Sequence, residues 1–143
     1  MVLLCACHES DNEQILDQLD QVIESKGLYA VRFERRVDSL RRELCTASDD
    51  TMRWRTANRL FDSYITYNID TAARYVALMY DLAEHTGRRD MKFLSTTCDI
   101  SVLIGRNNIE DAYDRIRSLD TAGITKRMRA NYYTQQMLSL IHI

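Results

Sequence analysis

The sequence predicts an all-α fold in which antiparallel helix hairpins stack side by side. One observation is an internal repeat with a step of forty residues, carried by Asn68-Ile69-Asp70-x-Ala72-x-x-x-Val76-x-x-Met79 and Asn108-Ile109-Glu110-x-Ala112-x-x-x-Ile116-x-x-Leu119. The apolar residue ahead of each stretch keeps the same step, at Leu60, Ile100 and Leu140. Self-similarity at such a period is typical of repeat proteins. A second observation is that no proline, which would break helices, occurs among the 143 residues.

Composition and charge narrow the function classes. The net charge is −2, so nothing global indicates a nucleic-acid-binding protein. No run of eighteen apolar residues is present, so we expect no transmembrane helix within this chain. None of the three histidines has a second ligand four residues on, and no nucleophile–base arrangement or glycine-rich phosphate loop is visible. We therefore expect no enzyme activity, no cofactor and no metal site.

The first ten residues have a composition of their own. Residues 1–7 read Met-Val-Leu-Leu-Cys-Ala-Cys, and polar residues follow at once. Leu4-Cys5-Ala6-Cys7 resembles a bacterial lipobox, although the basic and long apolar regions of a complete signal are missing. We interpret residues 1–10 as a truncated lipoprotein signal and linker, with Cys7 as the lipidation site. The alternatives are a chance apolar start and a Cys-x-Cys-His metal site, which is disfavoured because structural zinc sites take four ligands from paired clusters.

Residues 11–46 are predicted to form an amphipathic helical segment of one or two helices. Ile15, Leu16, Leu19, Val22 and Ile23 follow one another at helical spacing, and Gly27 is the point where one helix would become two. A second apolar stripe runs through Tyr29, Phe33, Val37, Leu40 and Leu44. The opposite face carries arginines interleaved with acidic residues, which favours a solvated, ion-paired face over a phosphate- or lipid-binding one.

Residues 47–143 are predicted to hold about two and a half repeats. Ala47-Ser48-Asp49-Asp50 is a turn and N-cap signal, and helices are expected over about 50–67, 70–85, 88–105, 108–119 and from about 124 onward. Each hairpin needs a neighbour to bury its second face. The residues expected to pack the repeats are Leu60, Ile69, Ala72, Val76, Met79, Ile100, Ile109, Ala112, Ile116 and Leu119. Cys45 and Cys98 also lie on apolar stripes; we expect both to be buried, and a disulfide between them stays open.

These repeats resemble tetratricopeptide repeats (TPRs) of a longer, forty-residue kind. Ala72 and Ala112 match the small residue that opens the second helix of each repeat, and Val76 and Ile116 match the large apolar position that follows. The resemblance covers about residues 50–143 and implies a TPR-like α-solenoid. It also implies a concave face, formed by the first helices, that binds a protein or peptide partner. Transferred by register, that face holds Trp54, Asn58, Phe61, Cys98 and Ser101, with the alternative that Trp54 and Phe61 belong to the core.

A narrower resemblance takes in the first half of the chain. The lipobox-like start is followed by Leu16-Asp17-Gln18-Leu19-Asp20, Tyr29-x-x-x-Phe33-Glu34-x-Arg36-Val37-Asp38-Ser39-Leu40-Arg41 and Tyr67-Asn68-Ile69-Asp70-Thr71-Ala72. Together these look like the N-terminal region of envelope-anchored TPR regulators of the Bacteroides type, which continue with a membrane helix, a coiled coil and a cytoplasmic domain. The resemblance implies a fragment: the sensor part of a membrane-associated transcription regulator, on the periplasmic side of the inner membrane.

The partners implied are a protein or peptide, and a membrane reached through lipid on Cys7 or through a downstream helix. No nucleic-acid contact is expected from this segment, and a homo-oligomer is left open. The alternative function is a cytosolic TPR scaffold or assembly chaperone. An all-helical enzyme or nucleic-acid binder is disfavoured by the mixed charge and the missing catalytic groups. Residues 138–143, Leu-Ser-Leu-Ile-His-Ile, also resemble a translated sequencing adapter, although Leu140 fits the repeat step of a native helix.

Overall fold

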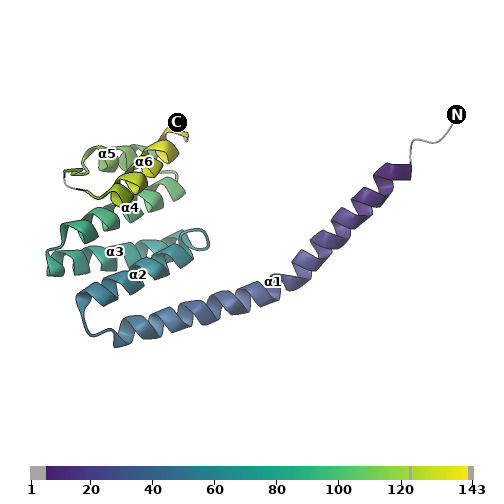
Figure 1. Cartoon of the computed structure of the whole chain (residues 1–143), viewed down its shortest axis with the longest axis horizontal. Coiled ribbons are helices and arrows are strands. Elements are labelled where there is room, and N and C mark those ends of the chain that lie inside the picture. Colours follow the sequence, from purple (N-terminus) through teal and green to yellow (C-terminus); the bar gives the residue numbers. More distant parts are fainter. Residues whose placement is uncertain (1–5, 123, 142–143) are drawn as a thin grey trace. The chain divides into compact units, whose positions relative to one another are not determined.

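The computed structural model describes residues 6–122 and 124–141, with side chains for 12–122, 124–126 and 128–137. Within the described ranges the regular structure is helix and no strand occurs, which confirms the all-α prediction (Figure 1). The helices are α1 (Ala6–Thr46), α2 (Asp50–Tyr64), α3 (Ile69–Thr86), α4 (Arg89–Gly105), α5 (Ile109–Arg117) and α6 (Lys126–Ile141). The chain divides into two compact units, Met1–Asp38 and Ser39–Ile143.

The first unit consists of most of α1. The sequence left one or two helices open here, and the structure has one, because α1 continues through Gly27. A single glycine inside a helix costs about 1 kcal/mol relative to alanine, which a long helix tolerates. Apolar side chains from Ile15 to Val31 are exposed. Val37, near the end of this unit, is fully buried.

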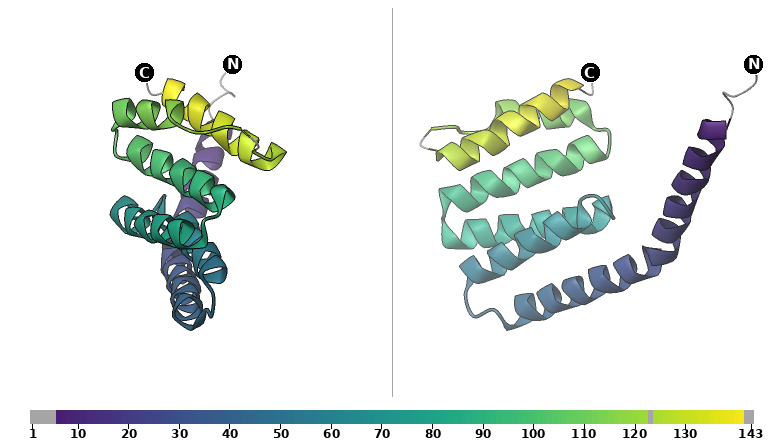
Figure 2. Two further views of the ribbon diagram at one scale, coloured as in Figure 1. Left: turned by 90° about the vertical axis from the view of Figure 1, so that its left-hand side faces the viewer. Right: turned by 45° about the vertical axis from the view of Figure 1, so that its right-hand side comes forward.

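The second unit is a stack of helix hairpins (Figure 2). Helix α2 packs against α3, α3 against α4, and α4 against α5, so the hairpins α2–α3 and α4–α5 lie one on the other. Helix α6 packs against both α4 and α5, as the first helix of a third hairpin would. Each hairpin therefore covers a face that its neighbour cannot cover for itself.

Residues related by the forty-residue step have matching surroundings. Leu60 and Ile100 are both 0% exposed, and so are Ala72 and Ala112. Alanine allows two helices to approach closely at these crossings, because it has no side chain beyond Cβ. The next pair, Val76 and Ile116, is also buried; Ile69 and Ile109 are both half-buried.

The last pair of the repeat breaks the equivalence. Met79 is 0% exposed inside α3, whereas Leu119 is half-buried and lies beyond the end of α5. Helix α3 has 18 residues and α5 only 9, so α5 is shorter than the sequence predicted. The equivalence therefore holds for the first turns of the two helices and fails at their ends.

The helix ends follow local side-chain chemistry. The side chains of Asp49 and Asn68 each accept a hydrogen bond at 2.9 Å from a backbone N–H of the first turn, at the starts of α2 and α3. Gly87 ends α3 in the left-handed conformation at φ 64°. Asn108 occupies the N-cap position of α5, but its Nδ2 donates to Asp111 Oδ2 at 2.6 Å and its side chain accepts no backbone hydrogen bond.

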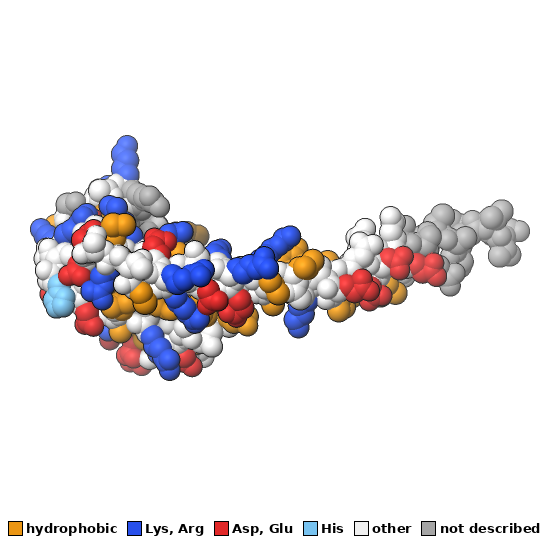
Figure 3. Space-filling view, turned by 90° about the horizontal axis from the view of Figure 1, so that it is seen from below, with side chains coloured by type: hydrophobic (Ala, Val, Ile, Leu, Met, Phe, Trp, Pro, Cys, Tyr) orange, Lys and Arg blue, Asp and Glu red, His pale blue; other side chains and the backbone are white. Residues whose placement is uncertain are grey.

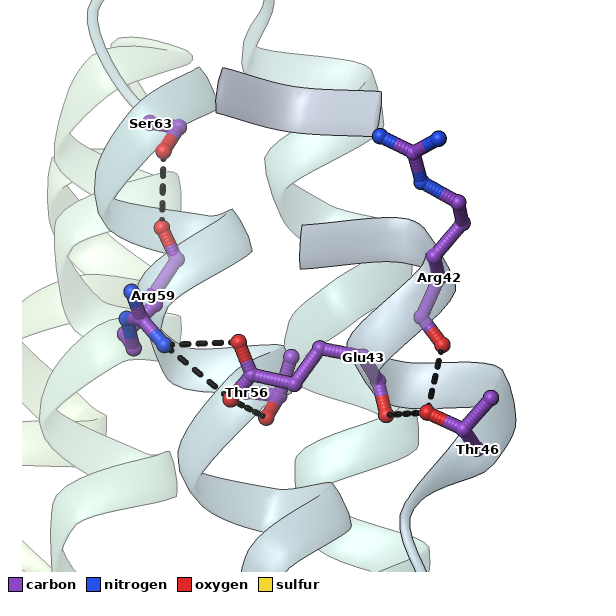
Figure 4. Close-up of polar contacts among 6 residues, drawn as sticks. All are labelled: Arg42, Glu43, Thr46, Thr56, Arg59 and Ser63. Atoms are coloured by element: carbon purple, nitrogen blue, oxygen red, sulfur yellow. Dashed lines mark hydrogen bonds and ion pairs between the residues drawn. The ribbon is translucent and has the colours of Figure 1, made fainter. Parts of the chain in front are cut away.

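Polar contacts join the last turns of α1 to α2 within the second unit (Figure 4). Thr56 Oγ1 donates to Glu43 Oε1 at 3.0 Å, and Arg59 Nη1 lies 2.9 Å from Glu43 Oε2. Thr56 is 2% exposed, so its hydroxyl requires a partner of this kind. These contacts make the end of α1 part of the repeat stack.

Candidate functional site

The predicted ligand-binding face belongs to the first helix of each hairpin, α2 and α4. Trp54 and Phe61 on α2 are 6% and 5% exposed. The indole Nε1 of Trp54 donates to Ser95 Oγ on α4 at 3.0 Å, in a buried hydrogen bond. Both aromatic rings are therefore packed inside the stack and offer little surface to a ligand in this conformation.

The other three predicted ligand-binding residues lie half-buried between neighbouring first helices. Cys98 Sγ is 3.6 Å from Asn58 Oδ1, and Gln135 Nε2 donates to Ser101 Oγ at 2.8 Å. The structure thus brings Asn58, Cys98 and Ser101 to seams that join α2 to α4 and α4 to α6. Peptide binding by these residues stays a prediction, because their polar atoms are already used between helices.

A second surface is a pocket of about 450 Å³ between α3, α4, α5 and the connection that leads to α6. A volume of this size is within the range of small-molecule and peptide side-chain sites. Its apolar wall is formed by Tyr80, Phe93, Leu119, Ile124 and Met128. Polar residues complete the lining: Arg89, Asp90, Lys92, Thr96, Arg115, Ser118, Asp120 and Thr125, with Ala122 at the connection.

The pocket lies where α5 ends earlier than α3 does in the forty-residue register. In the forty-residue register Asp120 corresponds to Tyr80, and α3 continues past Tyr80 to Thr86. Helix α5 ends at Arg117, and Ser118, Leu119, Asp120 and Ala122 of the connection that follows line the pocket together with residues of α4. In repeat proteins, departures from the repeat commonly fall on the binding face. Sequence reasoning missed this pocket; the available signal was the Asp-Thr-Ala-Gly turn at 120–123, where the first hairpin has helix.

Ion pairs surround the pocket and hold its polar side chains in place. Arg89 on α4 pairs with Asp120 on the connection, and Arg115 on α5 lies 3.3 Å from Asp99 Oδ2. Asp120 also accepts a hydrogen bond from the Ala122 N–H at 2.9 Å. That N–H and then Arg89 hold the pKa of Asp120 below its ordinary value. The carboxylate thus ties the connection to α4 across the pocket rim.

Tyr80 lies at the α3 side of the pocket and is half-buried. Burial raises the pKa of its phenol, so the hydroxyl remains protonated at neutral pH. The oxygen is 3.5 Å from Asp99 Oδ2, at the outer limit of a hydrogen bond. The hydroxyl is thus a neutral polar group in the pocket lining, in contact with Thr96 and Asp99 of α4.

Other predicted features fall partly outside the described residues. Residues 1–5 and the side chain of Cys7, the predicted lipidation site, are not described. Among the described residues, no three His, Cys, Asp or Glu side chains gather as a metal site would require. No helix in the described part of the chain is long and apolar enough to span a bilayer.

The comparisons with known proteins give one family match. The model of the SusR N-terminal TPR domain matches residues 23–139, which is most of the chain and includes every hairpin described above. No curated protein and no solved structure matches. The stacked hairpins and the family match agree on the architecture that the forty-residue repeat predicted. The chain belongs to the family of SusR N-terminal TPR domains.

Proposed function

We propose that this chain is the extracytoplasmic sensor part of a membrane-associated transcription regulator, and that it binds a protein or peptide in the pocket beside α5. TPR domains are in general protein-interaction modules, and the family takes its name from SusR. The observation that carries the proposal is the pocket, because it lies where the second hairpin departs from the repeat. The lipobox-like start supports a position outside the inner membrane.

The pocket suits one apolar side chain of an extended peptide with a polar backbone around it. Phe93 and Met128 are buried beneath its surface, and Leu119 and Ile124 are half-buried beside them. Arg89 is paired with Asp120 and Arg115 with Asp99, so an apolar ligand group would not strip these arginines of partners. The same arrangement gives no reason to expect a highly charged ligand.

Peptides selected from a random display library on the purified chain test this proposal. Ala122→Arg places a long side chain at the pocket mouth from an exposed position, so we expect it to weaken binding of the synthesised, labelled peptides at least tenfold. Ala77→Arg is the matched control, since Ala77 is exposed on α3 away from the pocket lining. Equal binding to both variants contradicts the pocket. If Asn58→Arg abolished peptide binding instead, the peptide would bind the face formed by the first helices.

The complete reading frame tests the regulator part of the proposal. A secretion signal ahead of Cys7 and a membrane helix downstream of residue 143 are the expected result. Palmitate labelling of the full-length product should then depend on Cys7, with Cys5→Ser as the control. A cytosolic, unacylated product would favour the scaffold or chaperone function instead.

A further inference from the structure

The N-terminal half of α1 exposes large apolar side chains along most of its length. Eight of them, each 49% to 64% exposed, are Ile15, Leu16, Leu19, Val22, Ile23, Leu28, Tyr29 and Val31. A contiguous exposed apolar surface on a soluble domain usually marks a contact with something else. This stretch lies within the first unit and is separate from the pocket.

Three of these exposed apolar side chains, Leu16, Leu19 and Ile23, lie in a coiled-coil spacing that continues through Lys26, Ala30 and the half-buried Phe33. Alternating steps of three and four residues connect the six positions that we call the α1 seam: Leu16, Leu19, Ile23, Lys26, Ala30 and Phe33. The same steps lead on to Val37 and Leu40, which are buried. A seam with this period lies along one side of a helix and fits a second helix of the same kind.

Charge along α1 is divided between its two halves (Figure 3). Residues 11–24 contain five carboxylates and no cation: Asp11, Glu13, Asp17, Asp20 and Glu24. Residues 26–42 contain six cations, Lys26, Arg32, Arg35, Arg36, Arg41 and Arg42, against the two acids Glu34 and Asp38. A parallel pair of such helices would place like charges together, whereas an antiparallel pair places each acidic half beside a basic one.

The seam also matches itself when the helix is reversed. Turning a second copy about the point between Ile23 and Lys26 sets Leu16 opposite Phe33, Leu19 opposite Ala30, and Ile23 opposite Lys26. In the second of these layers a large side chain meets a small one. In the third, the lysine stem can cover the isoleucine while its ammonium reaches toward the acidic half of the other helix. One polar residue in a seam also selects register and partner number.

We infer that α1 pairs with α1 of a second copy of this chain, as an antiparallel two-helix coiled coil through the α1 seam. The occupant of the exposed face is thus a second copy, related by a two-fold axis so that the same patch contributes on both sides. The inference goes beyond the proposed function and does not depend on it.

Light scattering after size exclusion, with the whole chain at micromolar concentrations, tests the pairing. We expect a dimer, converted to monomer by Leu19→Glu because that carboxylate would be buried in the seam. Leu28→Glu is the matched control: Leu28 is 62% exposed on α1 but lies off the seam, so the dimer should persist. Circular dichroism establishes that both variants keep their helix content. A monomeric native chain, or equal effects of the two variants, overturns the inference.

Disulfide trapping tests the orientation. Leu19→Cys and Ala30→Cys chains, each with the four native cysteines replaced by serine, are mixed and oxidised. The antiparallel register predicts a cross-link between the two different chains and little within either alone. Cross-links of Leu19→Cys to itself and Ala30→Cys to itself would show a parallel pair and overturn the orientation. A monomer that binds lipid vesicles through the same face would overturn the pairing altogether.

Discussion

At the scale of single residues, Cys45 and Cys98, the two cysteines whose side chains the structure describes, have different surroundings. Both are free thiols, so the disulfide that the sequence left open is not formed. Cys98 is half-buried, and burial, with the nearby charges of Asp62 and Asp99, raises its pKa to about 12. Cys45 is exposed, so the prediction that it is buried is wrong. It lies in the last turn of α1, on the side that the stack leaves open to solvent.

Alkylation should separate these two thiols. Iodoacetamide at pH 8 is expected to label Cys45 much faster than Cys98, because only the thiolate reacts and the raised pKa keeps Cys98 protonated there. Peptide mapping by mass spectrometry measures each rate in one sample. In urea the two rates should converge, which controls for the reagent. Comparable labelling rates of Cys45 and Cys98 in the folded chain would show that the Cys98 thiol is not shielded and that its pKa is not raised.

At the scale of elements, Gly27 within α1 and Gly87 at the end of α3 have opposite roles. Gly87 ends α3 at φ 64°, a backbone conformation that disfavours any side chain with a Cβ. Gly27 lies inside α1 with ordinary helical geometry and no atom within 4 Å of an added Cβ. Neither site has a steric obstacle, so backbone conformation alone decides the effect of an alanine.

Substitution by alanine should therefore change stability in opposite directions. Gly87→Ala is expected to destabilise the repeat stack by about 1 kcal/mol, since it forces alanine into the left-handed region. Gly27→Ala is expected to favour α1 by roughly 0.5–1 kcal/mol through higher helix propensity. Urea unfolding measures the first, and the helical signal in circular dichroism at rising temperature measures the second. A stabilising Gly87→Ala would contradict the left-handed end of α3.

At the scale of the whole molecule, stability of the second unit depends on contacts between hairpins. The buried bond from Trp54 to Ser95 joins α2 to α4, and Ile100 packs with Ala112 and Ile116 under Tyr132 of α6. In a stack of this kind each repeat contacts only its neighbours, and these contacts couple the folding of one to the next. Two hairpins and α6 form a short array, so we expect the unit to unfold as one.

Ile100→Ala tests this coupling, because Trp54 is the single tryptophan and reports on the other hairpin. Removing a fully buried side chain should cost about 2–5 kcal/mol. The tryptophan fluorescence transition in urea is expected to shift by the same amount as the circular dichroism transition. Leu60→Ala, in the first hairpin, is the matched control and should shift both signals as well. A shift seen by circular dichroism alone would mean that the hairpins unfold independently.

The sequence by itself determined the helices, their order and the equivalence of the two hairpins. These features follow from local or repeated signals: the helical period, the capping residues, and the small residues Ala72 and Ala112. None of these signals requires knowledge of which helices pack together. The helical period also indicated most of the buried positions, whereas the family followed from the resemblance of the motifs and from the family match. Gly87, where α3 ends at positive φ, is a local feature of the same kind, because glycine adopts that conformation at little cost.

Only the tertiary structure decided where the repeat fails and what lies exposed. The early end of α5 and the pocket beside it depend on how Asp120 is held by Arg89 and the Ala122 N–H, partners that no periodicity identifies. Periodicity also does not identify the hydrogen bond between Trp54 and Ser95, because these residues lie on different helices. The apolar spacing along α1 would be the same whether that face of the helix were covered or exposed. Periodicity identifies the side chains that share a face, whereas their burial depends on a neighbouring element. The large apolar side chains from Ile15 to Val31 are exposed in the part of the chain that the structure describes, and the proposed pairing with a second copy would bury those on the α1 seam.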